Sequence, residues 1–154
     1  MKVLFVCTGN TCRSPMAEKI LRKKALENQT DVEVKSAGIM AFEGSPASEH
    51  ARQIMKEYGM SEEHQTQRVT KGLLEWADVV LAMTEGHKGV LVEQYPEFVD
   101  QIFTLKEYSY GPDDPFVLGD VEDPFGGDLH TYRKTASEIE KAIRLWITKD
   151  EKSE

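Results

Sequence analysis

Cysteine is scarce in this chain, since Cys7 and Cys12 are the only two among 154 residues. A secreted fold stapled by disulfides needs more cysteines, spread along the sequence. A zinc site needs a cluster of ligands, and none of the four histidines has zinc-type spacing with these two cysteines. We therefore expect no metal site and no cofactor.

Long apolar runs and an excess of positive charge are also missing. No stretch of about 18 apolar residues is present, so no transmembrane helix is expected. Only one lysine and a four-residue apolar run precede Cys7, which is too short for a secretory signal, and we expect a cytoplasmic protein. The net charge of −8 argues against nucleic acid or an anionic membrane as a partner. The length suits one domain, residues 1–154, and we expect a monomer.

Short apolar segments alternate with helical patterns along the chain. Strands separated by helices predict an α/β fold, a parallel sheet with right-handed crossovers and helices on both faces. Ligands of such sheets bind outside the carboxyl ends of the strands, where Cys7 falls. The predicted strands are Val3–Val6, Val32–Ala37, Val79–Met83 and Gln101–Leu105, and the predicted helices are Pro15–Glu27, Ala47–Tyr58, Thr70–Trp76, Glu85–Glu93 and Leu129–Lys149.

The segment after the first strand, C-T-G-N-T-C-R-S-P, combines a cysteine with groups that bind anions. Ser14 followed by Pro15 is typical of an N-cap and first helical position, which puts the loop at a helix N-terminus, where amide N–H groups and the dipole favour an anion. Gly9 and Asn10 accept left-handed backbone, so successive N–H groups can turn inward as a nest. Arg13 adds a planar fork that can hold two phosphate oxygens.

Cys7 lies at the base of this predicted anion site. The thiolate is the attacking form of a cysteine, and a helix N-terminus with a nearby cation favours that form. Ser14 is placed to donate a hydrogen bond to the sulfur, which would stabilise Cys7 as attacker and as leaving group. The pattern predicts nucleophilic attack by Cys7 on a phosphoryl group that Arg13 clamps.

The string from Cys7 to Pro15, directly after an N-terminal strand, resembles the signature of the low-molecular-weight protein tyrosine phosphatase family. The resemblance spans essentially the whole chain and implies a single-domain, four-stranded, flavodoxin-like sheet. It implies that Cys12 traps an oxidised Cys7 as a disulfide, although Cys12 fits a small loop-packing residue equally well. The residues that it assigns to substrate binding are Thr8, Gly9, Asn10, Thr11, Cys12, Ser14 and Phe125.

Cleavage also needs a proton for the leaving atom, which a carboxylic acid can supply before it activates water. Candidates lie in a long loop, Tyr108–Pro115 and Val117–Asp128, rich in Gly, Pro and Asp. Asp114 and Asp123 both precede Pro-Phe, but only Asp123 continues into two glycines, as in the acid loop of the family. We predict Asp123 as the acid and Asp114 as a solvated turn residue. The other candidate acids are Asp113, Asp120 and Glu122.

The segment His64–Lys71 resembles a family segment whose histidine supports the phosphate loop. Taken from the sequence alone, His64 fits a surface position in a polar stretch. With the resemblance, we expect His64 to support Asn10 and Ser14 through a polar network that Ser36 joins.

Thr11 and Phe125 bear on which phosphorylated side chain is cleaved. The family resemblance implies phosphotyrosine, or phosphoarginine in a bacterial branch. Tyrosine phosphatases of the family usually carry an aliphatic residue at the position of Thr11 and often a tyrosine at that of Phe125. A threonine suits a polar, planar guanidinium better than a phenyl ring. We predict a protein-arginine phosphatase, with protein-tyrosine phosphatase as the alternative.

Two other classes use a similar loop. Arsenate reductases need further cysteines for a thiol relay, and none follows Cys12. A non-catalytic module that binds phosphoproteins would use the anion nest and Arg13, but it has no need of both Cys7 and Asp123. The expected partners are therefore phosphorylated protein substrates.

Overall fold

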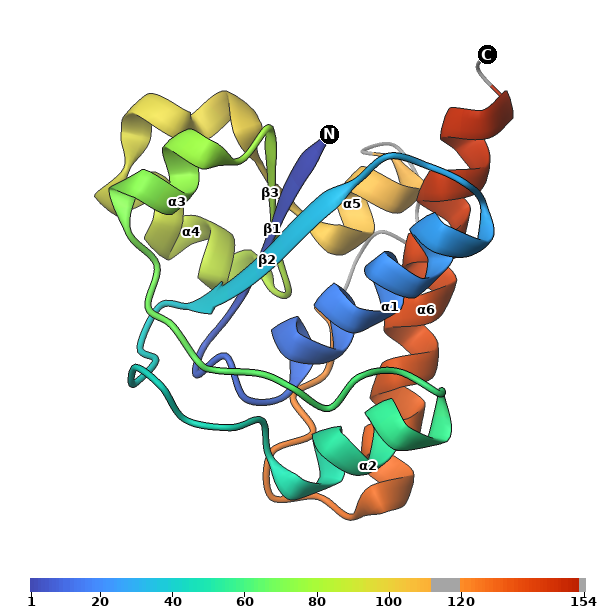
Figure 1. Cartoon of the computed structure of the whole chain (residues 1–154). Helices are drawn as coiled ribbons and strands as arrows, with labels where there is room; N and C mark the ends of the chain where they lie inside the picture. Colours follow the sequence, from blue (N-terminus) through green and yellow to red (C-terminus); the bar gives the residue numbers. More distant parts are fainter. Residues whose placement is uncertain (112–119, 153–154) are drawn as a thin grey trace.

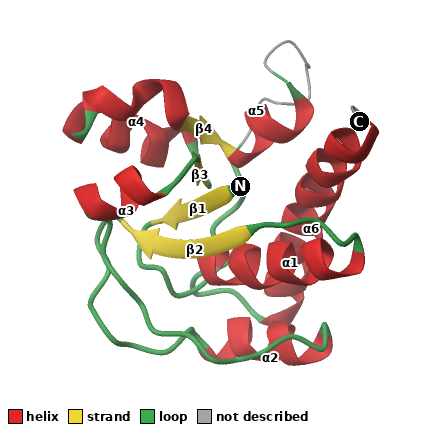
Figure 2. Cartoon of the chain, turned by 45° about the horizontal axis from the view of Figure 1, so that its top comes forward, coloured by secondary structure: helices red, strands yellow, loops and turns green. Residues whose placement is uncertain are grey.

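The computed structural model describes residues 1–111 and 120–152. At its centre four parallel strands lie in the order β2-β1-β3-β4; Figure 1 labels the first three of them and Figure 2 all four. This arrangement confirms the predicted four-stranded parallel sheet, and its order is that of flavodoxin-like folds. No helix in these two ranges has the length and apolar character needed to cross a membrane. The strands are β1 (Lys2–Cys7), β2 (Glu33–Gly38), β3 (Val79–Ala82) and β4 (Ile102–Thr104).

Helices lie on both sides of the sheet (Figure 2), as expected from the alternation of strand and helix patterns. One side carries α1 (Arg13–Glu27), α2 (Glu49–Glu57), α5 (Leu105–Tyr110) and α6 (Leu129–Lys152). The other side carries α3 (Lys71–Trp76), α4 (Glu85–Gln94) and the short 3₁₀ helix η1 (Pro96–Gln101).

The alternation of side chains along β1 decides which side Cys7 faces. Successive residues of a strand point to opposite faces of the sheet. Val3, Phe5 and Cys7 belong to the apolar core under α1 and α6, whereas Leu4 and Val6 belong to the core under α3 and α4. Cys7, the last residue of β1, is therefore buried on the α1 side, at the carboxyl end of the sheet.

Helix α1 begins two residues closer to the loop than its cap signal suggests. Ser14 was predicted to be the N-cap and Pro15 the first helical residue, but the helix starts at Arg13 and Cys12 occupies the cap position without a side-chain cap bond. This correction has a physical cause, because the Ser14 hydroxyl bonds to Cys7 and Asn10 instead of to the helix amides. Pro15 is tolerated because amides of a first turn have no intrahelical acceptor.

Helix α5 replaces part of the predicted loop. The sequence predicts a strand to Leu105 and a loop from Tyr108, yet Leu105–Tyr110 is helical. A capping box fixes this start, since the Thr104 hydroxyl accepts from the Glu107 amide while the Glu107 carboxylate accepts from the Thr104 amide. Asp113 and Asp114 lie outside the described residues.

Candidate active site

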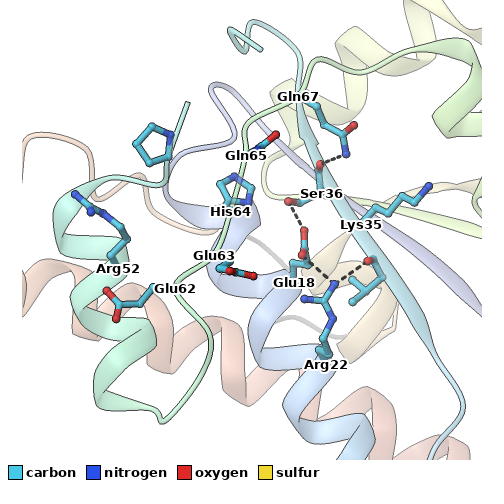
Figure 3. Close-up of a pocket in the computed structure, with 12 residues that line it drawn as sticks. Glu18, Arg22, Lys35, Ser36, Arg52, Glu62, Glu63, His64, Gln65 and Gln67 are labelled. Atoms are coloured by element: carbon cyan, nitrogen blue, oxygen red, sulfur yellow. Dashed lines mark hydrogen bonds and ion pairs between the residues drawn. The ribbon is translucent and has the colours of Figure 1, made fainter. Parts of the chain in front are cut away.

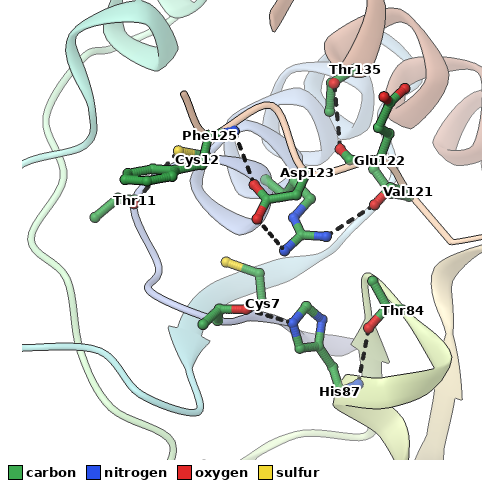
Figure 4. Close-up of polar contacts among 12 residues, drawn as sticks. Cys7, Thr11, Cys12, Thr84, His87, Val121, Glu122, Asp123, Phe125 and Thr135 are labelled. Carbon is green, nitrogen blue, oxygen red and sulfur yellow. Dashed lines mark hydrogen bonds and ion pairs between the residues drawn. The ribbon is translucent and has the colours of Figure 1, made fainter. Parts of the chain in front are cut away.

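A pocket of about 240 Å³ opens where β1 gives way to α1. Its lining brings the predicted nucleophile and the predicted acid together, although 116 positions separate them in the sequence. Figure 4 shows the Cys7 sulfur and the Asp123 carboxylate facing the same space, with the Phe125 ring on the side of Thr11 and Cys12. The lining residues are Cys7, Thr8, Gly9, Thr11, Cys12, Arg13, Asp123 and Phe125.

The backbone of the loop leaves its amide groups available. Within the described ranges, no backbone N–H of residues 8–12 donates to a protein acceptor. Carbonyl groups of the same segment are instead held from outside, so the loop is fixed through its acceptors while its donors stay free for an anion. These bonds run from the Met40 amide to the Thr8 carbonyl (2.9 Å), from the Ser48 amide to the Thr11 carbonyl (2.9 Å), and between His64 Nε2 and the Asn10 carbonyl (2.7 Å).

Asn10 organises the loop from behind and does not line the pocket. Its φ of 59° lies in the left-handed region that asparagine tolerates. Asn10 Nδ2 donates to Ser14 Oγ and Ser36 Oγ, both at 2.9 Å, and Oδ1 accepts from the Gln67 amide at 3.0 Å. Since an amide nitrogen only donates, Ser14 Oγ is the acceptor of that bond. The Ser14 hydrogen is then available to Cys7 Sγ, 2.9 Å away.

The two predicted supporting residues both contact Asn10. His64 binds its backbone carbonyl and Ser36 its side chain, whereas Ser14 is reached only through the Asn10 side chain. Ser36 accepts from Asn10 and donates to Glu18 Oε1 at 2.7 Å, and Arg22 binds the other oxygen of Glu18 at 3.0 Å. His64, Ser36, Glu18 and Arg22 line a separate cavity of about 860 Å³ (Figure 3).

Arg13 joins the loop to the segment that carries the predicted acid. Its side chain is only 6% exposed, and Nη1 donates to the Val121 carbonyl at 3.0 Å. The Val121 amide in turn donates to the carbonyl of Met83, the residue that follows β3. Arg13 Nη2 lies 3.6 Å from Asp123 Oδ2, whose side chain is 53% exposed. Such a half-solvated ion pair contributes at most ~1 kcal/mol of stability, so the Asp123 carboxylate can leave Arg13 and contact a substrate instead.

A tight turn presents Asp123. Its Oδ1 accepts from the Phe125 amide at 3.0 Å, and the Gly127 amide bonds to the Pro124 carbonyl at 2.8 Å. Gly126 has a φ of 82°, a conformation that only glycine adopts without strain. The turn leaves the Phe125 ring 77% exposed at the mouth of the pocket.

His87 is a site residue that the sequence did not indicate. It lies near the start of α4, is 6% exposed, and its Nε2 is 2.8 Å from Thr8 Oγ1. Burial, followed by the positive charge of Arg13, lowers the pKa of His87 from 6.5 to about 4, so the ring is neutral near pH 7. Only the topology could have indicated His87 as a site residue, because α4 follows β3 and begins at the same edge of the sheet as the loop.

Cys12 is buried beside Tyr132 and Ser48. Its sulfur lies 3.2 Å from the Tyr132 hydroxyl and 3.5 Å from Ser48 Oγ. Burial, followed by the bond to Cys12, raises the pKa of Tyr132 to about 12, which keeps the phenol protonated. Both cysteines are free thiols. In the part of the chain that the structure describes, no three His, Cys, Asp or Glu side chains are grouped to hold a metal ion.

A buried cysteine under free amides, with a buried arginine and a carboxyl group at the same pocket, defines the class of cysteine-dependent phosphatases. The chain belongs to the low molecular weight phosphotyrosine protein phosphatase family, whose model matches residues 2–154.

Several relatives are close in sequence and structure. The chain is 49% identical over 142 residues to a protein-arginine-phosphatase of Geobacillus stearothermophilus, with 92% of this chain and 90% of the relative covered. A solved structure of a cysteine-to-serine mutant of YwlE arginine phosphatase with a phosphorylated active-site serine is 40% identical, with a TM-score of 0.91 and coverage of 97% and 95%. A solved low molecular weight protein tyrosine phosphatase from T. tengcongensis is 49% identical, with a TM-score of 0.88 and coverage of 97% and 99%.

Proposed function

We propose that this protein hydrolyses phosphoarginine side chains of proteins through a phosphocysteine intermediate. The observation that carries the proposal is the single pocket that holds Cys7, Arg13, Thr11 and Asp123 in a chain 49% identical to a protein-arginine-phosphatase. The phosphorylated serine in the arginine phosphatase mutant supports a covalent phosphoenzyme, because a serine there accepts the phosphoryl group at the active-site position.

The first step breaks the P–N bond of the substrate. The Cys7 thiolate attacks phosphorus, stabilised by the Ser14 hydroxyl 2.9 Å from its sulfur. The free amides of residues 8–12 and the guanidinium of Arg13 bind the equatorial oxygens, whose charge they stabilise in the transition state. Asp123 gives its proton to the leaving nitrogen, and its carboxylate then pairs with the guanidinium cation that forms.

The second step returns Cys7 to its starting state. Asp123, now a carboxylate, removes a proton from a water molecule that attacks phosphorus. The S–P bond breaks, inorganic phosphate leaves, and the sulfur departs as a thiolate stabilised by Ser14. No metal is required, because Arg13 and the amides supply the positive charge.

Thr11 supports arginine as the substrate side chain. It lines the pocket on the same side as Phe125 (Figure 4), where the group that carries the phosphate passes. A hydroxyl there suits a polar guanidinium, whereas isoleucine would pack against a phenyl ring. A difference of one methyl group in a pocket changes the discrimination between two substrates by only ~1–3 kcal/mol, or roughly 10- to 200-fold in kcat/KM. Phosphotyrosine is the second candidate, favoured by the tyrosine phosphatase that is 49% identical.

A paired assay tests the substrate assignment. Hydrolysis of a phosphoarginine peptide and of the matched phosphotyrosine peptide is measured for the wild type, Thr11→Ile and Cys7→Ser. We expect the wild type to prefer phosphoarginine, Thr11→Ile to shift the ratio toward phosphotyrosine, and Cys7→Ser to be inactive. A wild-type preference for phosphotyrosine that Thr11→Ile leaves unchanged contradicts the assignment. Equal rates for the wild type and Cys7→Ser contradict the enzyme mechanism itself.

We also propose that the enzyme is redox-sensitive and acts in the cytoplasm on phosphorylated proteins, without nucleic acid or membrane partners and as a monomer. Support for the redox part is that Cys7 and Cys12 are both free and belong to one pocket. A sulfenic acid on Cys7 would be trapped by Cys12 as a disulfide. A reducing compartment keeps the attacking thiol available, which is the basis for the cytoplasmic location.

A further inference from the structure

His87 has one satisfied nitrogen and one without a partner. Nε2 lies 2.8 Å from Thr8 Oγ1, in the loop residue that directly follows Cys7. Nδ1 is buried and has no hydrogen-bond partner among residues 1–111 and 120–152. The backbone of His87 is fixed in the first turn of α4, because its amide donates to the capping hydroxyl of Thr84 (Figure 4). A buried polar atom without a partner is uncommon enough to need an explanation.

The surroundings decide which nitrogen carries the proton of the neutral ring. A proton on Nδ1 would leave a buried N–H without an acceptor, whereas a proton on Nε2 leaves only an unused lone pair on Nδ1. A buried N–H without an acceptor is rarer, and costs more free energy, than a buried lone pair without a donor. Nε2 is therefore the protonated nitrogen, and it donates to Thr8 Oγ1.

This direction leaves the hydrogen of the Thr8 hydroxyl without a protein acceptor. Thr8 Oγ1 has no other hydrogen bond within the described ranges, and Thr8 lines the pocket. We propose that His87 is a positioning residue that fixes the Thr8 hydroxyl as a donor to an oxygen of the bound phosphoryl group. The inference rests on the proposed function only in that the pocket receives a phosphoryl group, whichever side chain carries it.

Two amide substitutions separate this role from a packing role. Glutamine places its terminal amide near the position of His87 Nε2, whereas asparagine ends near Nδ1 and cannot reach Thr8. The inhibition constant of inorganic phosphate is measured against turnover of an aryl phosphate, together with kcat. We expect His87→Asn to weaken phosphate binding about 10-fold or more, as for a hydrogen bond to a charged group, and His87→Gln to recover most of it. Equal losses in both variants overturn the proposal.

Substitutions at Thr8 give a second test that holds even if His87→Asn fails to fold. Thr8→Val keeps the shape but removes the hydroxyl and should weaken phosphate binding about as much as His87→Asn, while Thr8→Ser should keep it. In the Thr8→Val background, adding His87→Asn should weaken phosphate binding no further. Wild-type affinity in Thr8→Val overturns the proposal, as does a full second loss in the double variant. Neither result touches the arginine assignment, because inorganic phosphate reports on the loop alone.

Discussion

Replacing Asn10 with alanine should destabilise the protein strongly, although its side chain points away from the pocket and into the network behind the loop. The side chain makes three hydrogen bonds, two of them buried and one partly buried, and each contributes ~1 kcal/mol. At a φ of 59°, exchanging asparagine for alanine adds about 1 kcal/mol, since left-handed backbone disfavours a residue with a Cβ and no local polar group. The expected loss is about 4 kcal/mol, a large part of the ~5–15 kcal/mol that stabilises a domain.

Urea unfolding followed by tryptophan fluorescence measures this loss. Asn10→Gly should recover about 1 kcal/mol relative to Asn10→Ala, because glycine accepts the left-handed backbone. Gln29→Ala is the matched control, since Gln29 also has a positive φ, of 52°, but is exposed and makes no side-chain hydrogen bond within the described part of the chain. It should change stability by less than about 0.5 kcal/mol. A loss below about 1 kcal/mol for Asn10→Ala refutes the claim that Asn10 holds the loop.

Three further predictions concern the acid, the loop and the buried histidine. Asp123→Asn should lower kcat about 10²- to 10⁴-fold in steady-state assays, and its effect on kcat/KM should be smallest for an aryl phosphate whose leaving group needs no proton. Gly38→Ala should reduce activity and lower the melting temperature, because the new Cβ would lie 2.5 Å from the Thr8 carbonyl oxygen; an unchanged melting curve contradicts this. Since the pKa of His87 falls to about 4 on folding, the unfolded chain binds a proton that the folded one does not. Stability should therefore fall by about 3 kcal/mol as the pH drops from 6.5 to 4, and urea titrations of His87→Gln should lack this part of the loss.

Local patterns were enough to predict the chemistry of the pocket. The Cys7-to-Pro15 string contains the nucleophile, the clamp and the free amides within nine consecutive residues, so no long-range information is needed. The Asp-Pro-Phe-Gly-Gly turn is equally local, because its geometry follows from the carboxylate, the proline and the glycines. The four strands match the predicted ranges within one or two residues, because three are short apolar runs and Val32–Ala37 alternates apolar and polar residues.

Features that depend on tertiary partners could not be predicted in the same way. Ser14 resembles an N-cap in sequence, but the neighbouring Asn10 and Cys7 take its hydroxyl. His87 reaches the loop only because β3 lies beside β1, and no local sequence pattern predicts which strands are neighbours in the sheet. Helix α5 is different, since its start is marked locally by the Thr104–Glu107 capping box, whereas the apolar run before it favours a strand that continues to Leu105.

The central claim is that the phosphoryl group passes through the Cys7 sulfur. Rapid acid quenching of the wild type during turnover of an aryl phosphate, followed by peptide mass spectrometry, tests it directly. The account predicts a phosphoryl adduct on the peptide that contains Cys7, and more of it in Asp123→Asn, where water is no longer activated. Turnover without any adduct, or an adduct on another residue, contradicts it.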